Sequence, residues 1–291
     1  MKPRPVGKTE LLLACASLLV ACGLVEIAAR RGFMLPHNPS ANGWWTVAWL
    51  KRSAVHTASG PDVPIDKFHP VLGWTLRENL RGVPLLASTV NSNSQGVRGV
   101  REYPLAKGEH TRIVVIGDSY TFGEGVNDDQ TFAAGLERMV EHCEVLNLGV
   151  HGYGTDQQLL RLELDGLKYR PDIVLLGYYE DDVSRNRLSF RDYQKPHFSV
   201  VDGRLVPDNL PISSPEAFRA RVHLRSLSYL DIFMTKFREQ RLREENVQRT
   251  RLILDEIFAK SRAIQAKVVQ LYLPTPDEVR ANESNHPGLF S

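Results

Sequence analysis

The chain has 291 residues, 42% of them hydrophobic, which is enough to bury one sizeable α/β core with additions. Its formal net charge is +2 and no basic cluster is interleaved with aromatic residues, so no nucleic-acid partner is indicated. Of the 3 cysteines, only Cys143 lies outside the apolar N-terminal segment, which excludes an internal disulfide framework and favours a small buried hydrophobe. No metal-ligand spacing is present, and we expect neither a metal nor a cofactor.

The N-terminus has the pattern of a membrane-targeting segment. Three basic residues, Lys2, Arg4 and Lys8, precede an uncharged run from Leu11 to Val25. If Glu26 is tolerated near the interface, residues 11–29 give 19 positions, close to the roughly 20 that span a bilayer. We therefore predict that residues 1–31 target or anchor the chain to a membrane.

Three interpretations of this segment remain open. A cleaved signal peptide fits the basic start and the short apolar core. The stretch Leu19-Val-Ala-Cys22-Gly resembles a bacterial lipobox, which would place a lipid on Cys22. An uncleaved signal anchor fits Glu26 and Arg30, which are neighbours on a helix. Basic residues on both flanks weaken the charge-asymmetry argument, but the anchor is our preferred interpretation. All three place the rest of the chain outside the cytoplasm, and the preferred anchor predicts a single segment in the bacterial inner (cytoplasmic) membrane with a periplasmic, extracytoplasmic domain.

Residues 32–64 are predicted to be a linker that carries the cluster Trp44-Trp45-x-x-x-Trp49. These rings either lie in the headgroup zone of the membrane or cover the surface of the following domain. The turn-rich stretches 68–74 and 91–98 then predict a hairpin-like lead-in to one domain that spans residues 65–291.

The centre of that domain alternates short apolar runs with helical patterns. Such alternation predicts parallel pairing with right-handed crossovers, and hence a doubly wound, mainly parallel sheet with helices on both faces. Thr155 is a plausible N-cap for the second helix. The predicted elements are strand 112–117, helix 128–142, strand 144–148, helix 155–169, strand 172–177 and a late strand at 267–273.

A helical insertion is predicted at about residues 184–266. Its first part, to about Pro211, has an irregular pattern with a turn at Asp202-Gly203, and Ser213-Ser-Pro-Glu216 predicts a capping box with an early proline. The charged stretch 236–251 is interpreted as a solvated helix face, with a cap over the active site as the alternative. The apolar residues of the helical part of the insertion are expected to face the core: Leu230, Phe233, Phe237, Leu252, Ile253, Ile257 and Phe258.

Polar blocks follow the first three predicted strands, and in an open α/β sheet the strand ends carry the site. These blocks are Gly117-Asp118-Ser119, Asn147-Leu-Gly149 and Asp181-Asp182. Gly-Asp-Ser alone could be a simple turn, but three blocks in order are more specific. Over about residues 65 to 275 the chain resembles the SGNH/GDSL hydrolase superfamily, in which the third block is usually Asn-Asp. The resemblance implies a flavodoxin-like three-layer fold and a serine esterase.

The resemblance also implies roles for these residues. Ser119 would be the nucleophile, and the backbone N–H groups of Ser119 and Gly149 would form two arms of the oxyanion hole. Gly149 also has a structural explanation, since glycine permits a strand-to-loop turn. The superfamily has an asparagine amide as the third arm, whereas Asp181 offers a carboxylate that accepts hydrogen bonds when ionised. Asp181 would have to be protonated, be replaced by another donor, or leave a weaker site. We expect Asp118, Asp182 and Asn186 to brace the loops.

The general base is the second departure from the superfamily, which takes it from an Asp-x-x-His block near the C-terminus. The nearest analogue here is Glu283-Ser-Asn-His286, with Glu283 only 10 residues past Leu273. That spacing leaves no room for a final strand and helix, so we interpret His286 as a look-alike of the base. The pattern stops at Ser291 without a closing helix, and we expect a C-terminal truncation.

Together these patterns predict a membrane-tethered, extracytoplasmic SGNH-type serine esterase or O-acyltransferase that is inactive as an incomplete chain. Its substrate would be a small acyl ester or an acylated carbohydrate, and water or a carbohydrate hydroxyl would accept the acyl group. The alternative is a non-catalytic envelope protein that uses the same scaffold for binding. A flavodoxin-like nucleotide binder is disfavoured, because no glycine-rich phosphate loop follows the first strand.

Overall fold

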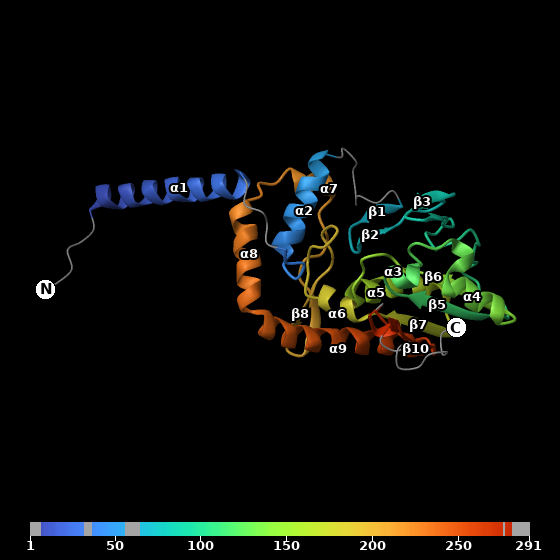
Figure 1. The fold of residues 1–291 in the computed structure, drawn as a ribbon. Helices are drawn as coiled ribbons and strands as arrows, with labels where there is room; N and C mark the ends of the chain where they lie inside the picture. Colours follow the sequence, from blue (N-terminus) through green and yellow to red (C-terminus); the bar gives the residue numbers. More distant parts are fainter. Residues whose placement is uncertain (1–6, 32–36, 56–64, 276, 281–291) are drawn as a thin grey trace.

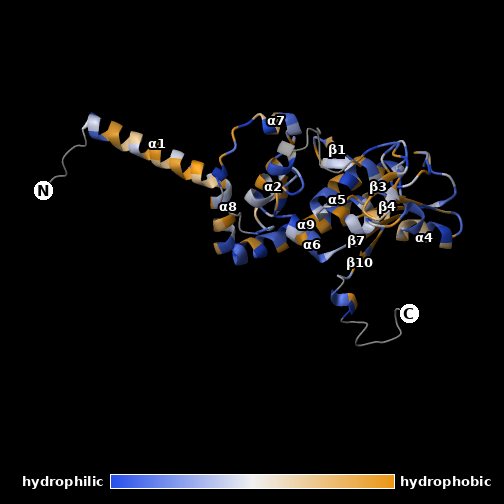
Figure 2. Ribbon diagram, turned by 45° about the horizontal axis from the view of Figure 1, so that its top comes forward, coloured by the Kyte–Doolittle hydropathy of each residue, from blue (hydrophilic) through white to orange (hydrophobic). Residues whose placement is uncertain are grey.

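The computed structural model describes residues 7–31, 37–55, 65–275 and 277–280. Helix α1 (Lys8–Arg31) projects from the folded part, and Figures 1 and 2 show it as a largely hydrophobic helix that meets the rest of the chain at its C-terminal end. Its 24 residues contain a stretch of mean hydropathy 2.4, and none of them is buried. At about 1.5 Å per residue it is long enough to cross a bilayer, a property that it shares with signal sequences.

A four-stranded parallel sheet forms the centre of the fold, in the order β10-β7-β5-β6 (Figure 1). Of these strands β5 comes first in the chain, and it lies between β6, the second, and β7, the third. This arrangement makes the sheet doubly wound. This confirms the predicted fold class and each predicted strand to within about a residue. The strands are β5 (Thr111–Ile116), β6 (Cys143–Asn147), β7 (Ile173–Tyr178) and β10 (Lys267–Tyr272).

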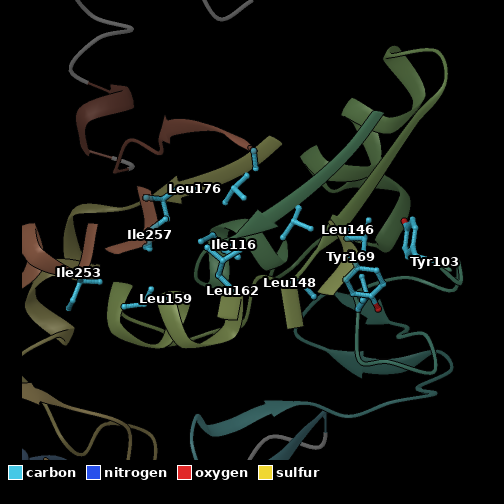
Figure 3. Packing of buried hydrophobic residues seen from close by; sticks show 14 residues of the cluster. Tyr103, Ile116, Leu146, Leu148, Leu159, Leu162, Tyr169, Leu176, Ile253 and Ile257 are labelled. Atoms are coloured by element: carbon cyan, nitrogen blue, oxygen red, sulfur yellow. The ribbon is translucent and has the colours of Figure 1, made fainter. Parts of the chain in front are cut away.

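Helices cover both faces of this sheet. Leu159 and Leu162, in the helical segment that follows β6, pack with Ile253 and Ile257 against one face, as Figure 3 shows. On the other face the helix α4 (Phe132–Met139) packs against a cluster that includes the buried Cys143, as expected. Successive apolar residues along β5 therefore belong alternately to two separate hydrophobic clusters, one on each face of the sheet.

Two predicted helices are interrupted in the structure. The expected helix 128–142 is a 3₁₀ turn, η1 (Asp128–Gln130), followed by α4, because Thr131 caps α4 by accepting a hydrogen bond from Ala134 N–H at 3.2 Å. Helix α5 (Thr155–Arg161) continues as the π-helical η2 (Leu162–Gly166) and the 3₁₀ turn η3 (Leu167–Tyr169). Thr155 is the first residue of α5 and Gly154 holds the N-cap position, so the predicted cap was wrong.

The lead-in consists of one helix and two hairpins. Helix α2 (Asn42–Val55) lies within the segment expected to be a linker, and its Trp49 is fully buried beside Phe190, Tyr193 and Phe218. Trp49 thus belongs to the domain's own core. The hairpins confirm the predicted turn-rich lead-in: β1 (Asp66–His69) with β2 (Gly73–Leu76), and β3 (Val83–Leu85) with β4 (Ser88–Val90).

The insertion is more regular than expected. Its first part contains the hairpin β8 (Phe198–Val201) and β9 (Arg204–Pro207), whose turn is the predicted Asp202-Gly203 pair with φ of 49° and 74°. Ser214, one residue later than predicted, caps the next helix by accepting a hydrogen bond from Ala217 N–H. The helices are α6 (Glu180–Arg185), α7 (Pro215–Arg219), α8 (Arg225–Phe237) and α9 (Glu239–Ala263).

One expectation about the insertion was wrong. Ile253 and Ile257 of α9 are buried in the core as predicted, but Leu230, Phe233 and Phe237 of α8 are 54%, 58% and 70% exposed. The chain changes direction between α8 and α9, so the apolar stripe of α8 does not continue into the buried stripe of α9 (Figure 1).

Candidate active site

The sheet order places Ser119 at a position where open α/β sheets bind ligands. The crossover from β5 leads to β6 on one side, and the next crossover returns past β5 to β7 on the other. The carboxyl ends of β5 and β7 therefore flank the topological switch point, and Ser119 directly follows β5.

A short helix, α3 (Ser119–Phe122), begins at Ser119 and is held by its neighbours. Asp118 is the N-cap, and its Oδ1 accepts a hydrogen bond from Tyr120 N–H at 3.0 Å. Gly123, in the left-handed region with φ of 82°, ends the helix. Ser119 is half-buried, and its Oγ lies 3.5 Å from Asp118 Oδ2, too far for a strong hydrogen bond. Asp118 braces the turn, as expected.

Three glycines at three strand ends let α3 sit directly on the sheet. A Cβ at Gly117 would lie 2.0 Å from Thr121 Oγ1, and one at Gly177 would lie 2.1 Å from the same atom. A Cβ at Gly149 would lie 2.5 Å from Phe122 N. The close approach explains why these strand ends lack side chains.

Gly149 is also tied to α3 through Asn147. The N–H of Gly149 donates to Asn147 Oδ1 at 3.0 Å, and Asn147 Nδ2 donates to the Thr121 carbonyl at 2.8 Å. The backbone donor that the sequence suggests for an oxyanion hole is thus engaged by a neighbouring amide in this structure.

Arg185 joins the loops that follow the three strands. Its Nη1 lies 2.9 Å from Asp118 Oδ2, 2.6 Å from Asp182 Oδ1 and 2.9 Å from the Tyr153 carbonyl. Burial lowers the pKa of Arg185, but the Asp182 and Asp118 carboxylates outweigh it and the pKa is raised. Burial, and then the charge of Asp118, raises the pKa of Asp182 well above its usual range.

The two residues of the acidic pair have opposite environments. Asp182 is fully buried, whereas Asp181 is exposed in the first turn of α6, where its carbonyl accepts a hydrogen bond from Ser184 Oγ at 2.7 Å. The ring of Tyr120 packs against Tyr179, with centroids 4.6 Å apart. This contact brings the residue after Ser119 next to the residue before α6, so the loops of Ser119 and Asp181 are neighbours.

Asn186 braces the base of the site, as expected. Its Nδ2 donates to Thr155 Oγ1 at 2.6 Å and to Thr250 Oγ1 at 2.8 Å, linking α5 to α9. A fully buried ion pair between Lys195 and Asp156 adds a second link, from the insertion to the start of α5.

The predicted base look-alike His286 lies outside the described residues. Sequence reasoning missed a different histidine, His151, two residues past Gly149, whose Nε2 lies 2.9 Å from the buried Asp66 Oδ2. Burial lowers the pKa of His151, but Asp66 outweighs it and raises the pKa to about 9. An imidazole that is protonated at neutral pH cannot accept the proton of Ser119. No sequence signal connects His151 to Asp66, which is distant in the chain.

In the described part of the chain, no group of three or more His, Cys, Asp or Glu side chains is arranged to hold a metal ion. No protein-family model matches the chain, and no curated protein matches it.

The chain is similar to two solved esterases, with low superposition scores. One is AlinE4, described as an SGNH-hydrolase family esterase: 15% identity, 64% of this chain and 97% of that chain covered, TM-score 0.26. The other is a catalytic mutant of the acetylxylan esterase Axe2 from Geobacillus stearothermophilus: 16% identity, 56% and 77% covered, TM-score 0.25. These likenesses add nothing about the chemistry at Ser119. The described part of the chain has an α/β fold with a parallel, doubly wound sheet, and the three blocks lie in order at the ends of its strands.

Proposed function

We propose that the protein is a serine esterase or O-acyltransferase that acts through an acyl-enzyme on Ser119. The observation that carries this proposal is the position of Ser119: first residue of α3, at the switch point, in a turn locked by Asp118 and Arg185. A serine held in this way is presented on a rigid scaffold rather than on a mobile loop.

In the proposed reaction, Ser119 Oγ attacks the ester carbonyl while a base takes its proton, and the alcohol leaves from the tetrahedral intermediate. The oxyanion would bind the N–H of Ser119 and that of Gly149, which would exchange or share its hydrogen bond to Asn147 Oδ1. Water or a carbohydrate hydroxyl would then take the acyl group from Ser119. A small acyl ester or an acylated carbohydrate is the proposed substrate class.

The proposed reaction requires a group that accepts the proton of Ser119. Among the described residues no histidine forms a hydrogen bond with Ser119, whose Oγ lies 3.5 Å from Asp118 Oδ2. Asp118 is held by Arg185 and by Tyr120 N–H, so its carboxylate is already committed. Within this chain we test His286 as the base.

Covalent labelling tests the nucleophile. The protein encoded by the complete reading frame is purified and treated with a fluorophosphonate probe, alongside Ser119→Ala and His286→Ala. We expect labelling of the parent chain that is lost in Ser119→Ala, and a peptide map that places the probe on Ser119. Equal labelling of the parent and Ser119→Ala chains, or no labelling of either, would overturn the proposal. If His286→Ala lowers the labelling rate about 100-fold or more, His286 is the base rather than a look-alike.

We further propose that α1 tethers the protein to the bacterial inner membrane with the folded part in the periplasm. The support is the length and the apolar character of α1 and the absence of buried residues from it. A protease added to spheroplasts should degrade the folded part, whereas a protein facing the cytoplasm would be protected.

A second candidate function is binding without turnover on the same scaffold. Two observations favour it: Asp181 stands where an amide donor is expected, and the N–H of Gly149 is engaged by Asn147. A binder would retain an acylated oligosaccharide with the same dissociation constant in the parent and Ser119→Ala chains, and would release no free acid from it.

A further inference from the structure

Helix α8 carries an apolar stripe that no part of the described chain covers. Leu227, Leu230, Phe233 and Phe237 are 59%, 54%, 58% and 70% exposed. Spacings of three, three and four residues place these four side chains on a single face of the helix. A hollow of about 670 Å³, lined in part by Tyr229, Phe233 and Phe237, continues this surface.

The opposite face of α8 is the one that packs against the folded part. Ile232 and Thr235 are buried there, and Asp231 Oδ2 accepts a hydrogen bond from Gly43 N–H of α2 at 2.7 Å. Asn38 Nδ2 donates to the Ile232 carbonyl at 3.3 Å. The apolar stripe therefore points away from α2 and from the domain.

The beginning of α8 is fastened to the end of α1. Glu26 accepts hydrogen bonds from the N–H groups of Arg225 and Ser226, each at 3.0 Å, and from Ser226 Oγ at 2.8 Å. Arg30 Nη2 donates to the His223 carbonyl at 2.9 Å. A carboxylate at the N-terminus of a helix satisfies N–H groups that have no partner within the helix, so this junction fixes the position of α8 relative to α1.

The direction of α8 completes the geometry. In Figure 1, α8 runs across the direction of α1, along the edge of the folded part from which α1 leaves, and α8 contacts both α1 and α2. If α1 crosses a bilayer along its normal, α8 lies parallel to the membrane plane, with the apolar stripe facing the lipid.

We propose that Leu227, Leu230, Phe233 and Phe237 lie in the headgroup region of the membrane that α1 spans. This inference rests on the proposed tether. A helix with one apolar and one polar face binds the membrane interface in this way, and the exposed Lys236 and Arg238 beside the stripe suit anionic headgroups. The folded part then has two attachments to the bilayer, which fix the orientation of the Ser119 site relative to it.

Fluorescence quenching in proteoliposomes tests the contact. In a Cys15→Ala, Cys22→Ala background, in which the remaining Cys143 is buried, an introduced cysteine replaces Leu230 or Phe233 and carries an NBD probe. The vesicles contain phosphatidylglycerol and phosphatidylcholine. Lipids with a doxyl group near the headgroup should quench both probes by about twofold or more, because interfacial helices lie within about 10 Å of that level. Val247→Cys on α9 is the control, since Val247 is 56% exposed but lies beyond the stripe, and it should be quenched little.

A probe at Leu18, in the middle of α1, separates this inference from the tether on which it rests. If deep doxyl lipids quench the Leu18 probe but the α8 probes respond only like Val247, the tether stands and the membrane contact of α8 is overturned. If the Leu18 probe is not quenched, both fail. Shielding of the α8 probes from iodide without quenching by lipid, together with cross-linking between copies, would show that a second chain covers the stripe. Unchanged melting temperatures check that the variants are folded.

Discussion

Arg185 shows how a single residue can hold three loops together. Two buried carboxylates, Asp118 and Asp182, share its guanidinium, so the cluster carries one more negative than positive group. That imbalance, added to burial, explains why the pKa of Asp182 is raised.

Removal of Arg185 should therefore be costly. Arg185→Gln is expected to lower the free energy of unfolding by about 3–5 kcal/mol, because it leaves buried carboxylates without a counter-charge. Arg241→Gln is the control: its ion pair with Glu245 is exposed, and its loss should cost under about 1 kcal/mol. Denaturant titrations measure both, and similar costs for the two variants would contradict this account. Adding Asp182→Asn to Arg185→Gln should recover part of the loss.

The substitution Asp181→Asn tests the third oxyanion position. It replaces an acceptor with an N–H donor at nearly constant volume, so kcat/KM towards a short acyl ester should rise about tenfold or more. Because Asp181 is exposed, the change should alter stability little. Glu180→Gln, an exposed carboxylate in the same turn, is the control and should leave kcat/KM unchanged. A fall in Asp181→Asn would mean that Asp181 has a positive task, such as orienting a base.

His151 should make stability depend on pH in the alkaline range. Its pKa in the folded protein, about 9, is higher than the ordinary value of about 6.5, because Asp66 favours the protonated ring. The ion pair thus contributes fully below about pH 6.5, and its contribution is lost as the pH rises through about 9. Urea midpoints should fall over this window by the equivalent of up to about 3 kcal/mol. In His151→Gln the slope should vanish; an unchanged slope would assign it to other groups.

A feature of the site could be predicted where the residues that determine it are close together in the sequence. Ser119, Gly149 and the acidic pair follow strands that are visible as apolar runs, so their order along the sheet edge was predictable. Arg185 has one local sign, its spacing of three from Asp182, but its bond to Asp118 requires the folded sheet. The pairing of His151 with Asp66 depends entirely on how the lead-in hairpin packs.

At the scale of elements, the contact between α3 and the strand ends depends on glycine. Gly149→Ala should lower both stability and labelling of Ser119, because its Cβ would meet Phe122 N at 2.5 Å and displace α3. Gly135→Ala is the matched control: it lies in α4 with no atom within 4 Å of the added Cβ, and should stabilise by up to about 1 kcal/mol. Thermal unfolding compares the two. If both variants changed the melting temperature equally and in the same direction, the packing explanation would be contradicted.

The elements themselves were predictable to different degrees. The strands of the central sheet were predicted to within about a residue, since short apolar runs that alternate with helical patterns have few alternative interpretations. The helix boundaries were wrong where a single side chain decides them, as at Thr131, which caps α4. The exposure of Phe233 and Phe237 could not be foreseen, because an apolar stripe on a helix shows that a partner is needed, not which partner.

At the scale of the whole molecule, the junction between α1 and α8 bears on the three interpretations of the N-terminus. Glu26 and Arg30 both bond to the segment 223–226. A signal peptidase cut after the apolar core would remove these contacts and expose the first turn of α8. A cut before Cys22 would keep them, as would an uncleaved anchor.

The mass of the mature protein decides between these interpretations. We expect the protein extracted from bacterial inner membranes to have the intact mass of the uncleaved chain. Cys22→Ser should change that mass only by the replacement of sulfur with oxygen, and should leave the location of the protein unchanged. A mass that corresponds to a chain starting at Cys22 with acyl chains attached would instead establish a lipoprotein, provided that Cys22→Ser abolishes this form. A mass that corresponds to a chain starting after Arg30 would show that the junction between α1 and α8 is absent from the mature protein. The control is Cys15→Ser, which removes a cysteine from the same helix outside the lipobox-like stretch and should behave as the parent chain does. Since Glu26 completes the start of α8, Glu26→Ala should also increase amide exchange at Arg225 and Ser226 if the uncleaved chain is the working form.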